Sequence, residues 1–308
     1  MSIQPFDVVT GAFGYTGRYI AGALLARGRG VRTLTQHPER RSLFDGSVAV
    51  FPLDFDPAHL VQALRGADVL YNTYWVRFNR GAVTFDRAVE QCATLFDVAA
   101  AAGVRRIVHV SVTNADPRSP LPYFRGKGQA DAALRACGVP YAILRPALVF
   151  GLEDILLNNI AWCLRRLPVV GLPGDGHYPV QPVFAGDLGL LAAEAGEQSQ
   201  RIEIDAVGPE RFSYRSLVGL LASAVGSHAR VVGLPPRLAL LAANLLGMLN
   251  RDVMLTAGEV AGLSRGLLVS AQPPRGVTRF SDWVRGHGTQ LGRSYRSELA
   301  AHYATRSG

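Results

Sequence analysis

Lysine is almost absent from this chain. Of its 32 basic residues, 31 are arginine and one, Lys127, is lysine. Arginine therefore supplies nearly all of the positive charge, so a general need for charge does not explain why position 127 holds lysine. A lysine ammonium is a compact charge whose pKa shifts readily on burial, whereas a guanidinium stays charged. We therefore expect a chemical role for Lys127 that arginine cannot fill.

Cysteine is also scarce. The three cysteines, Cys92, Cys137 and Cys163, lie far apart and form no C-x-x-C pair. This pattern predicts a reducing compartment, with the thiols acting as small hydrophobic groups in or near the core. The seven histidines show no H-E-x-x-H or similar spacing, so we predict no metal site. The first residues resemble no secretory signal peptide, and we expect a cytoplasmic protein.

Long apolar runs are missing. No run reaches the roughly 20 residues that a membrane-spanning helix needs. The longest, residues 238–249, is interrupted by Asn244 and Gly247. It predicts a buried helix, with a helix lying on a membrane surface as the less favoured alternative.

The positive charge is not concentrated. The net charge is +8, yet the arginines are spread thinly and no aromatic residues alternate with them. This spacing argues against a nucleic-acid partner and is better explained by an arginine-rich composition and an anionic dinucleotide. The expected partner is a small-molecule substrate, and the sequence carries no indication of an oligomeric state.

The first half of the chain alternates short apolar segments with longer helical ones. Such alternation predicts an α/β fold of the Rossmann type, a doubly wound parallel sheet covered by helices on both faces. We expect an NAD(P)-binding domain over residues 1–150 and a smaller substrate lobe over residues 151–308, interleaved with the first. The expected strands are 3–10, 31–35, 47–52, 68–73, 106–112, 141–144 and 201–207, and residues 167–182 are expected to form a loop.

A glycine-rich turn follows the first expected strand. Gly11, Gly14 and Gly17 form a G-x-x-G-x-x-G pattern between a strand and a helix. A tight strand-to-helix turn needs a residue that tolerates positive φ, and close approach of a pyrophosphate needs the absence of side chains. The N-terminus of the helix then offers N–H groups to the phosphates. We expect the turn to bind the cofactor through Gly11, Phe13, Gly14, Tyr15, Thr16 and Gly17.

The end of the second strand indicates which dinucleotide is bound. An acidic residue there would bind the ribose 2′-hydroxyl of NAD. This chain has Thr35, His37, Arg40 and Arg41 in that region and no acidic residue at the strand end. These side chains suit a 2′-phosphate, so we predict NADP(H), with NAD as the alternative.

Tyr123 and Lys127 lie four residues apart on an expected helix and so share one face. With ten tyrosines in 308 residues, a randomly placed lysine falls four after a tyrosine only about 3% of the time (10/308), so chance is a poor explanation. A nearby ammonium favours the phenolate and lowers a tyrosine pKa, which lets the tyrosine exchange a proton with a substrate oxygen. Two hydroxyl residues, Thr113 and Ser111, close the preceding strand, where this fold places its ligands.

These motifs resemble the short-chain dehydrogenase/reductase superfamily, in particular its extended and atypical branches, which include epimerase/dehydratase-like, NmrA-like and complex I accessory-subunit-like members. The resemblance covers about residues 5 to 195. It implies that Tyr123 is the catalytic acid/base, that Lys127 activates it and binds the nicotinamide ribose, and that Thr113 binds the substrate oxygen, with Ser111 as second choice. It also implies that Asp54, after the third strand, contacts the adenine.

The resemblance implies an NAD(P)-dependent oxidoreductase or epimerase/dehydratase-like enzyme acting on a carbonyl or alcohol carbon. Two departures argue against a nucleotide-sugar substrate. The loop before Tyr123 is short, and Asn72-Thr73-Tyr74-Trp75 follows the fourth strand where sugar epimerases usually carry small residues. The alternative is a non-catalytic NADP(H)-binding sensor or assembly protein. A third possibility is a peripheral membrane protein that acts on a quinone or lipid.

Overall fold

The structure is a computed structural model that describes residues 5–303. The chain forms two compact units. The first runs up to Pro146 and adds Ala185–Ala206 and Gln272–Gly276. The second comprises Ala147–Phe184, Val207–Ala271 and the chain from Val277 onward.

The first unit is built on a seven-stranded sheet in which every pair of neighbouring strands is parallel. The strand order β3-β2-β1-β4-β5-β6-β11 is that of a doubly wound Rossmann sheet, so the predicted fold class is confirmed. Residues 3 and 4 of the first expected strand lie outside the described residues. The strands are β1 (Phe6–Thr10), β2 (Gly30–Thr35), β3 (Val48–Pro52), β4 (Val69–Asn72), β5 (Arg106–Val110), β6 (Tyr141–Leu144) and β11 (Ile202–Ile204).

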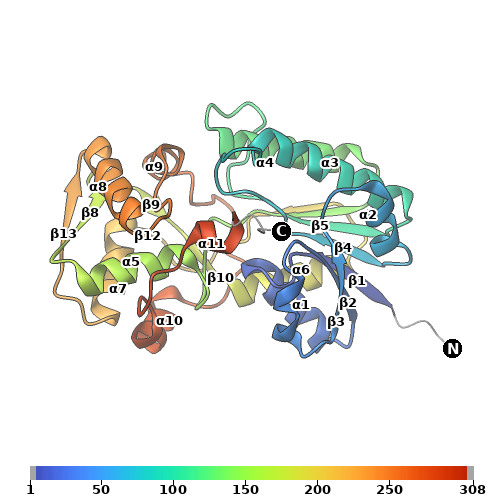
Figure 1. Cartoon of the computed structure of the whole chain (residues 1–308), viewed down its shortest axis with the longest axis horizontal. Coiled ribbons are helices and arrows are strands. Elements are labelled where there is room, and N and C mark those ends of the chain that lie inside the picture. The colour runs from blue at the N-terminus through green and yellow to red at the C-terminus, as the bar shows by residue number, and fades with distance from the viewer. Residues whose placement is uncertain (1–4, 304–308) are drawn as a thin grey trace. The chain divides into compact units, whose positions relative to one another are not determined.

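Helices cover both faces of this sheet (Figure 1). On one face, α2 (Pro57–Leu64), α3 (Phe85–Ala101) and α4 (Pro122–Ala136) pack side by side, and on the other α1 (Tyr15–Ala26) packs on α6 (Ala185–Glu197). A short 3-10 helix, Pro38–Phe44, links β2 to β3. The chain enters α6 from the second unit, and this helix was not predicted. The core under α2, α3 and α4 is formed by large apolar side chains such as Leu60, Leu70, Phe96 and Ile143.

The second unit combines helices with three short two-stranded sheets. The strand pairs are β7 (Leu148–Phe150) with β10 (Pro182–Phe184), β8 (Val169–Pro173) with β13 (Arg230–Leu234), and β9 (Pro179–Val180) with β12 (Phe212–Ser213). The prediction of a loop over 167–182 is therefore wrong in part, because β8 and β9 lie within it. The helices are α5 (Ile155–Arg166), α7 (Tyr214–Ala224), α8 (Pro236–Leu249), α9 (Ala257–Ser264), α10 (Phe280–His287) and α11 (Glu298–His302).

The apolar segment 238–249 forms α8, as a helix but not as a buried one. Large apolar side chains of α8 are exposed, so the prediction of a buried helix is wrong. Within residues 5–303, no helix is both long enough and apolar enough to cross a membrane.

Candidate functional site

The glycine turn links β1 to α1 with the conformation that its sequence predicts. Gly11 has a positive φ of 65°, which favours glycine. Its N–H donates to the Leu34 carbonyl of β2 (2.8 Å), and its own carbonyl accepts from the Gly14 N–H (2.7 Å). Gly14 then stands at the N-cap of α1. The backbone thus reverses direction tightly at the carboxyl edge of the sheet.

Gly17 keeps α1 close to this turn. A Cβ built at Gly17 would lie 2.1 Å from the Gly11 carbonyl oxygen, a distance that atoms cannot adopt. The first turn of α1 has no acidic residue, and no side chain caps it. Since the first N–H groups of a helix lack intrahelical partners, this N-terminus is suited to an anion.

The other residues of the turn differ in what they can offer a nucleotide. Phe13 is buried against the ring of Phe44 (6.3 Å between centroids), so only its backbone can contact a ligand. Tyr15 and Thr16 are half-buried in the first turn of α1, and the Tyr15 ring packs edge-on against Tyr19.

The ends of β2 and β3 bring the predicted nucleotide-contacting side chains to one edge. Thr35 pairs with Pro52 across the two strands, and its buried hydroxyl accepts a hydrogen bond from the His37 N–H (3.0 Å). His37 pairs with Glu39 through Nδ1 (3.1 Å). Arg40 lies in the following 3-10 helix with its guanidinium one-third exposed.

Asp54 follows β3 and stays half-exposed. Its carboxylate accepts from the Asp56 N–H (3.0 Å) and contacts His59 Nδ1 (2.7 Å). The hydrogen bond from His59 is the main reason that the pKa of Asp54 is lowered, and the same bond raises the pKa of His59. The carboxylate is thus ionised at neutral pH and accessible to a ligand.

A polar junction joins β1 and β4, where the strand order reverses. The Thr10 hydroxyl accepts hydrogen bonds from the N–H groups of Thr73 (2.7 Å) and Tyr74 (3.1 Å), and the Thr73 hydroxyl donates to the Thr10 carbonyl (2.6 Å). In open α/β sheets, ligands bind outside the strand ends at this switch point. The junction directly adjoins Gly11, since a Cβ there would lie 3.6 Å from the Thr73 hydroxyl.

Lys127 lies on α4 with its side chain only 3% exposed. Its ammonium donates to the Val110 carbonyl at the end of β5 (2.8 Å) and lies 4.5 Å from the ring centre of Trp75. Burial lowers the pKa of Lys127 to about 8. The only lysine of the chain is therefore a buried and titratable cation.

Tyr123 lies half-buried one turn before Lys127 on the same helix face. Its ring packs edge-on against Trp75 (6.3 Å) and Phe85 (5.9 Å). The Trp75 ring fits against α4 at Gly126, where a Cβ would lie 3.1 Å from it. Trp75 therefore contacts both members of the Tyr-Lys pair, which the sequence did not predict.

The two hydroxyl residues follow β5, which ends at Val110, rather than closing it as predicted. Both are buried. The Thr113 N–H donates to the Pro146 carbonyl (3.0 Å). Ser111 faces the Asp131 carboxylate and helps to offset the rise that burial causes in the pKa of that group. Thr113 and Ser111 thus lie beside the strand end that Lys127 contacts.

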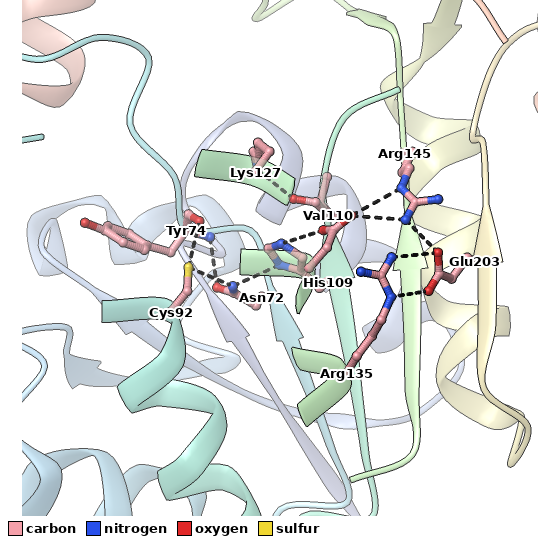
Figure 2. Close-up of polar contacts among 10 residues, drawn as sticks. Asn72, Tyr74, Cys92, His109, Val110, Lys127, Arg135, Arg145 and Glu203 are labelled. Atoms are coloured by element: carbon pink, nitrogen blue, oxygen red, sulfur yellow. Dashed lines mark hydrogen bonds and ion pairs between the residues drawn. The ribbon is translucent and has the colours of Figure 1, made fainter. Parts of the chain in front are cut away.

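A buried polar chain runs beneath this site (Figure 2). His109 on β5 is fully buried, and its Nδ1 accepts from Asn72 Nδ2 (3.1 Å). Its Nε2 lies 3.7 Å from Asp131 Oδ1 on α4, and burial holds the pKa of His109 well below its usual range. Asp131 pairs with Arg145 (3.1 Å), which also contacts Glu203 (2.6 Å). His109 is therefore a neutral, buried part of this network.

Two members of this polar network, Asp131 on α4 and Arg145 directly after β6, were not predicted from the sequence. Asp131 lies four residues after Lys127 and so shares its helix face, a spacing that could have revealed it. Arg145, directly after β6, could not be paired with Glu203 from the sequence because the two residues are 58 positions apart.

Comparison with known proteins identifies the nucleotide-binding part. Residues 11–151 match the family model described as NAD(P)H-binding. The (4-alkanoyl-5-oxo-2,5-dihydrofuran-3-yl)methyl phosphate reductase of Streptomyces griseus is 30% identical over 232 residues, which cover 72% of this chain and 75% of that protein.

A second relative is a subunit of a mitochondrial NADH-ubiquinone oxidoreductase. The mitochondrial NADH-ubiquinone oxidoreductase 40 kDa subunit of Neurospora crassa is 26% identical over 246 residues. The match covers 77% of this chain but only 65% of that subunit. The chain therefore spans slightly less than two thirds of the length of this relative.

Among solved structures, the NADPH complex of the quinone oxidoreductase QOR2 from Escherichia coli shares the fold. Its TM-score is 0.74 at 20% identity, with 91% of this chain and 99% of that chain covered. The glycine turn, the strand order and these matches agree, and the chain belongs to the NAD(P)H-binding protein family, in keeping with its resemblance to the extended and atypical branches of the short-chain dehydrogenase/reductase superfamily.

Proposed function

We propose that this protein is an NADP(H)-dependent oxidoreductase that reduces a carbonyl carbon of a small molecule, or oxidises the corresponding alcohol. The observation that carries the proposal is the position of the only lysine, which is buried four residues after Tyr123 beside the carboxyl end of β5. A buried cation at this place has a cost for folding, and catalysis offers a reason for it. The names of the reductase relatives are consistent with this class of reaction.

In this proposal, the bound nicotinamide supplies or accepts the hydride. Tyr123 gives a proton to the substrate oxygen as it becomes an alcohol, and takes it back in the reverse direction. The ammonium of Lys127 stabilises the phenolate that forms, since a nearby positive charge favours the ionised phenol. Thr113, or Ser111 as second choice, holds the substrate oxygen by its hydroxyl.

The glycine turn and the edge formed by β2 and β3 hold the dinucleotide in this proposal. The N-terminus of α1 binds the pyrophosphate through the backbone between Gly11 and Gly17, with Phe13, Gly14, Tyr15 and Thr16 in between. Asp54 contacts the adenine. Thr35, His37 and Arg40 surround the ribose, where a guanidinium favours the 2′-phosphate of NADP over NAD.

A non-catalytic NADP(H)-binding subunit or sensor is the second candidate. It is favoured by the contacts of Lys127, whose ammonium donates to a backbone carbonyl and lies against Trp75 rather than in solvent. Since Lys127 is almost fully buried, contact between this ammonium and a ribose hydroxyl would need Lys127 or the side chains around it to move. The match to the 40 kDa subunit of a mitochondrial NADH-ubiquinone oxidoreductase points the same way.

The two candidates differ in turnover. Purified protein is mixed with NADPH and a panel of carbonyl and quinone compounds, and the loss of NADPH absorbance is followed. We expect Tyr123→Phe to abolish turnover and to leave NADPH affinity within about twofold, because the phenol acts on the substrate and not on the phosphates. Tyr141→Phe is the matched control, since that phenol lies on β6 and donates to Glu203 (3.5 Å) rather than facing the proposed site.

Retained turnover in Tyr123→Phe would exclude the acid/base role. Tight NADPH binding without oxidation by any compound of the panel would support the non-catalytic candidate.

A further inference from the structure

Helix α8 has an unusual composition for a helix at a protein surface. Its fourteen residues, PRLALLAANLLGML, contain one charged residue, Arg237. A helix that is apolar on all sides is normally buried. Here only Ala239 and Gly247 of the helix are buried.

The helix turns one row of small residues toward the protein. Ala239, Ala243 and Gly247 recur every four residues, and α8 packs against β8 and β13 (Figure 1). A Cβ at Gly247 would lie 2.6 Å from the Asp252 carbonyl, so the contact at this end is tight.

Most of the large apolar residues of α8 point outward, and only Leu240 and Leu246 are half-buried. Five of them, at helical spacing, are 52–81% exposed: Leu238, Leu241, Leu245, Met248 and Leu249. A helix stabilised only by its own unit buries its large side chains and exposes the small or polar ones. The reverse arrangement marks this row of five residues, the α8 face, as a surface built for an apolar environment.

The α8 face is held firmly in place. Directly after the helix, the Asp252 carboxylate accepts hydrogen bonds from the N–H groups of Glu298 and Leu299 (2.9 Å each) and from the Tyr295 hydroxyl (2.7 Å). The exposure of the leucines is therefore a property of the folded second unit and does not come from a loose segment.

The exposed charges that flank the α8 face along the chain are arginines. Arg237 lies at the start of α8, Arg251 follows its end and Arg230 begins β13, and all three are exposed. Between residues 226 and 258 the only acidic residue is Asp252, whose carboxylate is engaged by the bonds above. An apolar row with arginine at each end complements an anionic surface with an apolar interior.

A second copy of the chain fits less well. If two α8 faces packed antiparallel about a two-fold axis, Arg237 would approach Arg251 of the partner subunit. If they packed parallel, Arg237 would approach Arg237 of the partner subunit. Both arrangements place like charges together, which disfavours the contact.

We propose that α8 is a membrane-surface helix that binds an anionic lipid bilayer. The five apolar side chains enter the boundary between headgroups and acyl chains, and the flanking arginines contact lipid phosphates. At about 1.5 Å per residue, fourteen residues form a helix too short to span a bilayer, so it lies in the plane of the surface. The proposal thus takes up the membrane-surface helix that the sequence analysis gave as the less favoured alternative to a buried helix.

The test is co-sedimentation with large vesicles of phosphatidylcholine alone or mixed with phosphatidylglycerol, at low and at physiological salt. We expect binding to the phosphatidylglycerol vesicles that weakens with salt. The double variant Leu241→Gln/Leu245→Gln should lower the partition coefficient at least about tenfold. The double variant Arg237→Gln/Arg251→Gln should lose the preference for phosphatidylglycerol. Leu190→Gln, on α6 and 49% exposed, is the matched control and should bind as the parent protein does.

Far-ultraviolet circular dichroism and NADPH affinity show whether each variant is folded. Failure of the folded parent protein to bind phosphatidylglycerol vesicles would overturn the proposal, as would equal binding of the leucine double variant. A concentration-dependent dimer, seen by sedimentation without vesicles and abolished in the leucine double variant, would instead assign the α8 face to a second copy and also overturn it.

Discussion

Replacing Lys127 by methionine should stabilise the folded protein while removing its proposed activity. The pKa of the buried ammonium is lowered from 10.5 to about 8 because burial disfavours the charged form. At about 1.4 kcal/mol for each unit of pKa, holding this charge at pH 7 costs the folded state about 3 kcal/mol. Methionine has a similar length and no charge, so it removes this cost.

Part of the gain is lost again at the end of β5. The Val110 carbonyl accepts from the Lys127 ammonium, and its loss leaves a buried acceptor without that donor, which costs about 1–3 kcal/mol. The net expectation for Lys127→Met at pH 7 is a gain of about 0–2 kcal/mol in the free energy of unfolding.

The stability difference between Lys127→Met and the parent protein should also change with pH. Between pH 8 and 10.5 the unfolded chain binds a proton at this lysine that the folded chain has released, so stability from this group rises with pH. The advantage of Lys127→Met should therefore shrink as pH rises from 7 and reverse near pH 10, where the neutral amine still donates to Val110. Cys92 and Cys163, whose pKa burial raises to about 11, act in the opposite direction. The useful quantity is thus the difference between variant and parent at each pH.

Urea unfolding, followed by circular dichroism at several pH values between 7 and 10, measures that difference. A difference that stays constant across this range would refute the reasoning, because it would mean that Lys127 does not titrate within it. A methionine variant that is less stable at pH 7 would show that the hydrogen bond and the contact with Trp75 outweigh the cost of burial.

Three further predictions concern the cofactor and the buried ion pairs. Gly17→Ala should destabilise the protein by about 1–3 kcal/mol and weaken NADPH binding, because its Cβ would meet the Gly11 carbonyl at 2.1 Å. Gly22→Ala, in the same helix, places its Cβ where no heavy atom lies within 4 Å and should stabilise the protein by about 0.5–1 kcal/mol. Equal unfolding midpoints for the two variants would contradict the close packing of the turn. Arg40→Gln should weaken NADPH binding about tenfold or more and leave NADH binding unchanged in calorimetry, and an equal loss for both would remove the 2′-phosphate assignment. The bonded arginines lower the pKa of Glu203 to about 2, so this group contributes stability above pH 4.5 that is lost as pH falls toward 2. Glu203→Gln should therefore lower the free energy of unfolding at pH 7 by about 1–2 kcal/mol, allowing for the partial exposure of Glu203, and should weaken its dependence on pH between 5 and 2. An unchanged acid transition would contradict this assignment.

The sheet and the glycine turn could be predicted because their signals are local. The first five strands of the first unit are short apolar runs, each followed by a helix, and Gly11 and Gly17 carry steric demands that a few neighbouring residues create. Expected and observed strand ends differ by at most three residues over β1–β6 and β11 in the described chain. The spacing of apolar residues and the residue types in turns therefore suffice to predict elements whose interacting residues are close in sequence.

The second unit was harder to predict because its strands depend on distant partners. β8 pairs with β13 in a register that joins Val169 to Arg230, and β9 has only two residues, which pair with β12. A proline- and glycine-rich segment such as 167–182 favours a loop on local grounds, and only these long-range pairings make part of it extended. The outward leucines of α8 could not be predicted either, since periodicity identifies an apolar helix but not which side faces the protein.

The site was predictable as a set of residue types but not as a set of contacts. The spacing of Tyr123 and Lys127 follows from the helix alone. The placement of Trp75 against both depends on Gly126 of α4, which leaves space for a ring that comes from the loop after β4. Such a fit joins segments about 50 residues apart and has no local signature.

The identity of the residue at position 127 can be argued from another buried cation. Arg106 on β5 is fully buried, donates to the Ala195 carbonyl (2.6 Å), and has two guanidinium nitrogens without hydrogen-bond partners among the described residues. This fold therefore buries arginine even with incomplete hydrogen bonding, so burial of a charge does not by itself require lysine. What arginine cannot provide is a cation small enough to lie between Trp75 and the Val110 carbonyl and able to release its proton near neutral pH. In a chain that otherwise uses only arginine, these two properties, compactness and titration, explain the single lysine, and Lys127→Arg should for the same reason fail to preserve either the packing or the proposed turnover.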